Sequence, residues 1–129
     1  MKKLLFLPLV LVACFCLAQD AKEIIGKPIK IGNLLVAQND FPDAMNWDDA
    51  KKACRALGKG WRLPSLSELD VLYRKRERIG NFADTYIFDD YILYWSLTGR
   101  PYFKFNEVAV PSDTYSKSNE YLVRAVRSL

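Results

Sequence analysis

The sequence predicts an α+β domain in which two helices pack on a mostly antiparallel sheet, and three observations predict it. Apolar residues recur at helical spacing in two stretches, 46–57 and 65–78. A short apolar run at 34–37 precedes both stretches. Short segments of strand-like composition follow them, the last at 121–127. This order of elements is typical of α+β domains.

The first 18 residues have the composition of a secretory signal peptide. Lys2 and Lys3 give a cationic start, an apolar run follows from Leu4 to Phe15, and the chain turns polar at Gln19. The apolar run is shorter than the roughly 20 residues that span a bilayer. We therefore expect residues 1–18 to be removed and the protein to be exported, periplasmic or extracellular, without a transmembrane anchor.

Two cleavage sites are compatible with this segment. Cleavage after Ala18 suits ordinary signal peptidase and is the one we favour. The run 11–14 also resembles a lipobox, in which Cys14 would carry a lipid anchor and the protein would be an envelope lipoprotein. That cleavage would leave apolar residues 15–17 at the start of the mature chain, where lipoproteins usually have a polar linker.

Composition argues against several classes of function. The chain has 19 basic and 15 acidic side chains, and without Lys2 and Lys3 the excess is too mild for a strongly basic nucleic-acid binder. The chain has no His, so it holds no Ser-His or Cys-His nucleophile pair. Only Cys54 remains after cleavage at Ala18, which leaves no internal disulfide or zinc site. We expect no enzymatic activity, no cofactor, no metal and no nucleic-acid partner.

The rest of the chain divides into a tether and one domain. Residues 19–30 are polar and basic and contain Pro28, so we expect a mobile polar tether. Residues 31–129 have enough apolar side chains to form a single domain around a hydrophobic core.

Local side-chain chemistry marks the start of both helices. Asn46 is a good N-cap for the first helix, which Gly58 should end. Ser65 and Glu68 form the pattern of a capping box for the second helix. We expect the second helix to continue through its basic residues to position 78, with an apolar stripe formed by Leu66, Leu69, Leu72 and Tyr73.

After the helices, the pattern favours strands. We expect them at 94–96, at 102–105, at 108–110 and at 121–127, with a polar loop at 112–119. Five residues that lie in apolar patterns are expected to be structural: Cys54, Trp61, Leu63, Leu69 and Trp95. For Trp47 the sequence leaves core packing and sugar stacking open.

An ordered series of motifs covers nearly all of residues 31–129. They are Ile31-Gly32-Asn33-Leu34, Asn46-Trp47-Asp48-Asp49-Ala50-Lys51-Lys52-Ala53-Cys54, Gly60-Trp61-Arg62-Leu63-Pro64, Tyr94-Trp95-Ser96 and Val123-Arg124-Ala125-Val126-Arg127. Together they resemble the Lcl C-terminal-like domain family, secreted bacterial domains of unknown function. The resemblance implies a C-type-lectin-like fold, related to that of formylglycine-generating enzymes, with paired chain ends and a second small sheet carrying long loops. Some family members are adhesins that bind polyanions such as glycosaminoglycans.

Basic residues of the second helix are the main candidate for a binding site. Arg74, Lys75 and Arg78 lie away from the apolar stripe and form one cationic face. A solvated face that complements the helix dipole would also explain them. The functional interpretation is a patch for an anionic glycan or envelope polymer, to which loop residues add charge and flat rings: Arg100, Lys104 and Lys117, with Tyr102 and Tyr115.

Two other functions stay open at this point. The protein could be a protein–protein interaction module of the cell envelope, in which the aromatic loop from Phe82 to Tyr94 docks a partner. A hydrolase would have to depend on carboxylates, for which Asp89, Asp90 and Glu107 are the candidates.

Overall fold

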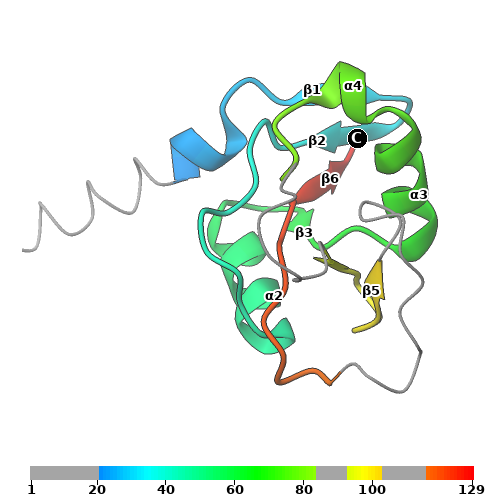
Figure 1. Ribbon diagram of the computed structural model, residues 1–129. Coiled ribbons are helices and arrows are strands. Elements are labelled where there is room, and N and C mark those ends of the chain that lie inside the picture. Colours follow the sequence, from blue (N-terminus) through cyan, green and yellow to red (C-terminus); the bar gives the residue numbers. More distant parts are fainter. Residues whose placement is uncertain (1–20, 84–92, 103–115) are drawn as a thin grey trace, which may run out of the picture.

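The computed structural model describes residues 21–83, 93–102 and 116–129, and it shows an α+β domain (Figure 1). The predicted signal peptide with Cys14 lies outside the described residues, as do the strand expected at 108–110 and most of the loop expected at 112–119. The predicted class, helices packed with an antiparallel sheet, is confirmed.

A four-stranded antiparallel sheet has the order β1-β2-β6-β3. Its strands are β1 (Ile29–Ile31), β2 (Leu34–Val36), β6 (Val126–Ser128) and β3 (Trp61–Arg62). Gly32, with φ of +59°, makes the tight turn between β1 and β2. In register, Leu35 of β2 lies opposite Arg127 of β6. The last strand therefore lies in the middle of the sheet, beside β2, so the C-terminal strand is joined to an early strand of the described domain.

The expectation of a mobile tether is wrong for residues 21–30. Residues 21–25 form a helix, and β1 already begins at Ile29. Ile24 is only 7% exposed, because it packs into the core. The amides of Gln38 and Asn39 donate to the carbonyls of Ile25 and Ile24, at 3.0 and 3.1 Å. Long-range apolar contacts and backbone hydrogen bonds, which composition does not reveal, fix this segment.

Both predicted helix starts are confirmed. Helix α2 (Trp47–Ala56) begins with Asn46, whose side chain accepts a hydrogen bond from the amide of Asp49 at 2.9 Å. Helix α3 (Leu66–Arg74) begins with a complete capping box. In it the Ser65 hydroxyl accepts from the Glu68 amide at 3.1 Å, and the Glu68 carboxylate accepts from the Ser65 amide at 2.8 Å.

The second helix does not run unbroken to position 78. Lys75 leaves helical geometry, with φ of −103° and ψ of 14°, and a short helix α4 (Arg76–Ile79) follows. The break turns the chain so that Ile79, which is 5% exposed, reaches the core. Leu66, expected in the apolar stripe, is instead 36% exposed at the first position of α3.

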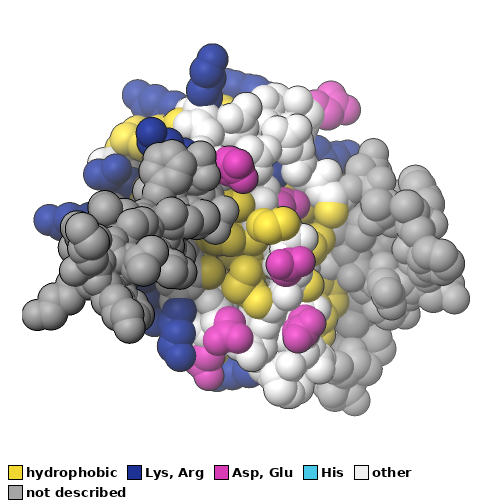
Figure 2. Space-filling model, turned by 90° about the vertical axis from the view of Figure 1, so that its left-hand side faces the viewer, with side chains coloured by type: hydrophobic (Ala, Val, Ile, Leu, Met, Phe, Trp, Pro, Cys, Tyr) yellow, Lys and Arg dark blue, Asp and Glu magenta, His cyan; other side chains and the backbone are white. Residues whose placement is uncertain are grey.

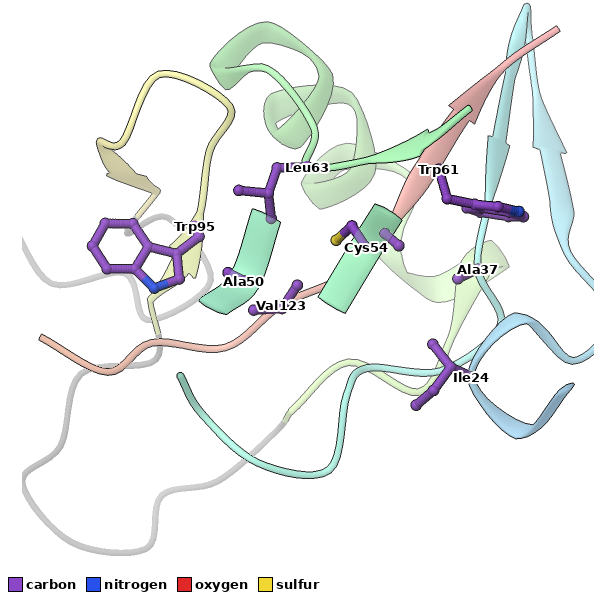
Figure 3. Packing of buried hydrophobic residues seen from close by; sticks show 9 residues of the cluster. Ile24, Ala37, Ala50, Cys54, Trp61, Leu63, Trp95 and Val123 are labelled. Atoms are coloured by element: carbon purple, nitrogen blue, oxygen red, sulfur yellow. The ribbon is translucent and has the colours of Figure 1, made fainter. Parts of the chain in front are cut away.

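Two hydrophobic clusters form the core. The first, shown in Figure 3, brings α2 together with residues from the sheet and from the segment before β6: Ile24, Ala37, Ala50, Cys54, Trp61, Leu63, Trp95, Val123 and Ala125. The second lies between the sheet and α3 and includes Leu69, Leu72 and Ile79. The five residues expected to be structural, Trp61, Trp95, Cys54, Leu63 and Leu69, are all buried.

A second, two-stranded sheet pairs β4 (Tyr94–Trp95) with β5 (Pro101–Tyr102). The indole N–H of Trp95 donates to the Met45 carbonyl at 2.6 Å, which attaches this sheet to the segment before α2. The long strand expected at 121–127 is mostly irregular, with isolated bridges at Tyr121 and Leu122 before β6. Among the described residues, no helix has the length and apolarity needed to cross a membrane.

Candidate functional site

The junction of α3 and α4 presents four cationic side chains and Glu77 in residues 74–78, which we call the basic segment. All of its side chains are exposed. Arg74 forms an ion pair with Asp70 one turn earlier, at 2.9 Å. The segment thus holds three of the predicted binding residues, Arg74, Lys75 and Arg78, on the surface.

Arg76, which the sequence analysis missed, belongs to the same segment. Its guanidinium lies over the ring of Tyr73, 4.2 Å from the ring centroid, and donates to the Tyr73 carbonyl at 2.8 Å. An Arg three residues after a Tyr on a helix is the sequence signal that could have indicated this stacking. Within the part of the chain that the structure describes, neither Lys75 nor Arg78 forms an ion pair.

Tyr102 is not available as a flat ligand partner, contrary to the prediction. It is 8% exposed in β5, and its hydroxyl donates to Asp70 at 2.8 Å. Burial, together with that carboxylate, raises the pKa of Tyr102. Tyr102 therefore positions Asp70, which in turn holds Arg74. Lys104 and Tyr115 lie outside the described residues.

Two lysines gather around Trp47, and we call these three residues the Trp47 cluster. The ammonium groups of Lys51 and Lys117 lie 3.5 and 4.5 Å from the centroid of the Trp47 ring. The indole N–H donates to the Ser96 carbonyl at 3.0 Å. A Cβ on Gly99 would lie 2.8 Å from the Lys117 side chain and 3.3 Å from the ring. Protein groups thus already occupy the surroundings of this ring, which favours the packing interpretation of Trp47 over sugar stacking.

The predicted binding residues fall into two separate groups. Arg100 is exposed and directly follows Gly99, so it belongs beside the Trp47 cluster with Lys117. In Figure 1, α4 lies at the top of the molecule, whereas the orange segment that contains Lys117 runs along the bottom. The structure does not join Arg100 and Lys117 to the basic segment as one patch.

A buried ion pair joins distant parts of the chain. Arg124 is fully buried, and its Nε donates to the carboxylate of Asp40 at 2.6 Å. Its two terminal nitrogens donate to the carbonyls of Ala37 and Gly80, at 3.1 and 3.2 Å. The guanidinium also lies 4.0 Å from the ring centroid of Phe82. One side chain therefore fixes the loops before α2 and after α4.

Tyr94 completes this network. Its hydroxyl donates to Asp40 at 2.5 Å and accepts from the amide of Ala83 at 3.0 Å. Burial raises the pKa of the Asp40 carboxyl, and the donors Arg124 and Tyr94 only partly offset this. This network was not predicted from the sequence, although an Arg between two apolar residues at 123 and 125 is a signal for a buried, paired charge.

Cys54 has the environment of a core residue. It is fully buried on α2, and burial raises the pKa of its thiol to about 12. A thiol that stays protonated at neutral pH is a poor nucleophile.

An apolar pocket of about 640 Å³ lies between the helix over 21–25, the segment 39–45 and the last turns of α2. Figure 2 shows this side of the molecule, with apolar side chains gathered in the middle and Asp and Glu side chains around them. The pocket was not predicted from the sequence, because residues 21–25, which form one of its walls, were expected to belong to the tether.

The carboxylates considered for a hydrolase, Asp89, Asp90 and Glu107, lie outside the described residues. The part of the chain that is described holds no group of three acidic, His or Cys side chains placed to bind a metal ion.

Comparison with known proteins assigns no family to the chain. No protein-family model matches the sequence, and no curated protein matches it.

Proposed function

We propose that this protein is an exported, non-enzymatic recognition domain that binds an anionic glycan or envelope polymer through the basic segment. The observation that carries the proposal is the exposure of four cationic side chains within five consecutive residues: Arg74, Lys75, Arg76 and Arg78. Glu77 is the single acid among them. Such a concentration of positive charge attracts polyanions and aligns with their repeating negative groups.

The surroundings of the basic segment support a binding role. Asp70 holds Arg74 and the Tyr73 ring holds Arg76, so both guanidinium groups are partly ordered before any ligand arrives. Ordering side chains in advance lowers the entropy cost of binding. Guanidinium groups also match sulfate and carboxylate geometry with two parallel hydrogen bonds. Lys75 and Arg78 add charge without an intramolecular ion pair in the described part of the chain.

The arrangement of the chain supports a more specific proposal, a C-type-lectin-like domain similar to the Lcl C-terminal-like family. The β2–β6 pairing joins an early strand of the described domain to the last one, α2 and α3 lie beside this sheet, and β4 and β5 form a small second sheet (Figure 1). The first 18 residues, which are cationic at the start and then apolar, support the proposal that the protein is exported. The mature chain would arise either by cleavage after Ala18 or by cleavage before a lipidated Cys14.

A non-enzymatic role is supported by the chemistry of the side chains. The chain has no His to serve as a general base near neutral pH. Cys54, the one described cysteine, is buried and protonated. Docking of a partner by the aromatic loop from Phe82 to Tyr94 gains no support from the described ends of that loop, because both residues pack inward against the buried network.

A glycan array with sulfated and carboxylated polymers, probed at low and at physiological salt, tests the proposal. We expect selective binding that weakens with salt, since the contacts are between exposed charges. The variant Arg74→Glu, Arg78→Glu should lose this binding.

The matched control is Lys27→Glu, Lys59→Glu, which makes the same change in net charge at exposed positions outside the basic segment. It should retain most of the binding. Equal losses in both variants would mean that overall charge, and not the basic segment, attracts the polymer. Absence of binding to every polymer would refute the proposal.

A further inference from the structure

The apolar pocket beside α2 has walls from three parts of the chain. Ile24 comes from the helix over 21–25, Phe41 and Met45 come from the segment before α2, and Ala53, Ala56 and the C-cap residue Leu57 come from the end of α2. The volume of about 640 Å³ lies within the range of ligand pockets, roughly 300–1,000 Å³. We call it the α2 pocket.

Backbone hydrogen bonds fix the walls of the α2 pocket. The Asn39 side chain donates to the Glu23 carbonyl at 2.7 Å, which ties the N-terminal helix to the segment before α2. The amides of Phe41 and Met45 donate to the carbonyls of Val123 and Tyr121, both at 3.0 Å. These bonds anchor the floor of the pocket to the C-terminal segment, so its shape is set by the fold and does not require a ligand.

Within the described residues, every charged side chain that lines the α2 pocket is acidic. They are Glu23, Asp40 and Asp43, and no described Lys or Arg lines it, although basic side chains outnumber acidic ones in the chain as a whole. Asp40 is committed to Arg124 and Tyr94. Glu23 and Asp43 are exposed, and neither side chain forms an ion pair within the described residues. An occupant therefore meets apolar walls and two available carboxylates.

We propose that the α2 pocket binds a peptide segment of a partner protein in which a bulky apolar side chain lies next to Lys or Arg. The apolar side chain would fill the pocket between Phe41, Met45 and Leu57, as anchor residues do at protein interfaces. The neighbouring cation would pair with Glu23 or Asp43 at the rim, which favours this class of segment over acidic ones. This inference does not depend on the proposed function, because the two surfaces have opposite charge and take different ligands.

Selection of random peptides displayed on phage against the purified protein tests the inference. At physiological salt we expect enrichment of sequences that combine a large apolar residue with an adjacent Lys or Arg. An enriched peptide, synthesised with a fluorescent label, then gives a Kd by fluorescence polarisation.

Two variants locate the binding site. Glu23→Lys, Asp43→Lys reverses the rim charge and should weaken binding of the enriched peptide by at least about tenfold. Ala56→Trp, at an exposed position of α2 that lines the pocket, should fill the pocket and weaken peptide binding by a similar factor. The matched control for charge is Glu77→Lys, Glu120→Lys, which changes two exposed acids outside the pocket and should leave the Kd within about twofold.

Thermal unfolding of each variant shows whether it is folded before its binding is interpreted. Should Ala56→Trp fail to fold, the charge-reversed variant and its control still decide the question, since they alter only exposed side chains. Enrichment of acidic peptides, or of none, would overturn the inference. Binding that is unchanged by the rim variant would overturn it as well.

Discussion

Arg124 shows how much of this fold depends on one side chain. It is fully buried, contacts Asp40, Ala37, Gly80 and Phe82, and so connects the N-terminal half of the domain to the C-terminal segment. Among the described residues, no buried side-chain nitrogen or oxygen lacks a hydrogen bond. A fully satisfied buried pair specifies one arrangement of the loops it joins, because losing either partner leaves an unpaired charge in the core.

Replacing Arg124 with Met should therefore destabilise the protein strongly. It leaves Asp40 buried without its cation, which costs about 3–5 kcal/mol. Urea unfolding of Arg124→Met measures this. The double variant Asp40→Leu, Arg124→Met should lose less than the sum of the two single variants, because it leaves no unpaired charge. Arg127→Met, at an exposed position three residues later, is the control and should change stability by at most about 0.5 kcal/mol. Additive losses would contradict the assignment of a coupled pair.

A second ion pair makes stability depend on pH. Arg62 donates to both oxygens of Glu68, at 2.7 and 2.9 Å, and also to the Ser128 hydroxyl, at 2.8 Å. The hydrogen bond from Arg62 is the main reason why the pKa of Glu68 falls from 4.5 to about 2. The pair thus links the start of α3 to β6.

Because the folded pKa of Glu68 is lowered, its contribution is complete above pH 4.5 and is lost as the pH falls toward 2. In this window the unfolded chain binds more protons, so stability should fall with falling pH. Glu68→Gln keeps a side chain suited to the capping box but removes the charge. Urea unfolding at several pH values should show the variant less stable than the wild type near neutral pH, with the difference shrinking as the pH falls to 2 and below. A gap that stays constant with pH would contradict this assignment.

Among the helices and strands, the features that could be predicted from the sequence are those that depend only on neighbouring residues. The caps at Asn46 and Ser65 form as expected, because each requires only side chains within one turn. The break at Lys75 was not predictable in the same way. The break allows Ile79 to pack against core residues that are far away in the sequence. Helical periodicity carries no information about these distant contacts.

The Ser65 cap gives a direct test at this scale. Ser65→Ala removes the acceptor for the Glu68 amide and should cost about 1 kcal/mol, within the 0.5–2 kcal/mol range of N-cap losses. Ser67→Ala is the matched control: it removes an exposed hydroxyl that lies 3.1 Å from the Ser65 hydroxyl but leaves the cap itself in place, so it should change stability far less. Chemical unfolding of the two variants side by side measures the difference, and equal losses would show that Ser65 does not act as a cap.

At the scale of the whole molecule, the distribution of charge matters more than its sum. The chain has a small positive excess, which by itself predicts little about partners. The fold places cations at the junction of α3 and α4, whereas the charged side chains among the described residues that line the α2 pocket are all acidic. The sequence indicated the first of these sites because Arg74, Lys75 and Arg78 are close along the chain. It could not indicate the second, whose acids come from two segments that are far apart along the chain, the helix over 21–25 and the segment 39–45.

The burial of Ile24 provides a test of whether residues 21–25 belong to the folded domain. Because Ile24 packs against the first core cluster, Ile24→Ala should cost about 2–5 kcal/mol, the usual loss for truncating a buried Ile. Lys22→Ala, at an exposed position of the same helix, is the control and should be nearly neutral. Thermal unfolding of both variants measures this. A neutral Ile24→Ala would mean that residues 19–30 behave as the tether that composition predicts.

The proposed recognition of an anionic polymer by the basic segment can be tested with a single binding measurement. The Kd for a sulfated polysaccharide would be measured at low and at physiological salt for three proteins: the wild type, Arg74→Glu with Arg78→Glu, and Arg100→Glu with Lys117→Glu. We predict that salt weakens wild-type binding, that the first variant loses at least about tenfold in affinity, and that the second stays within about twofold of the wild type. An affinity that does not change with salt, or a greater loss in the second variant than in the first, would contradict the claim.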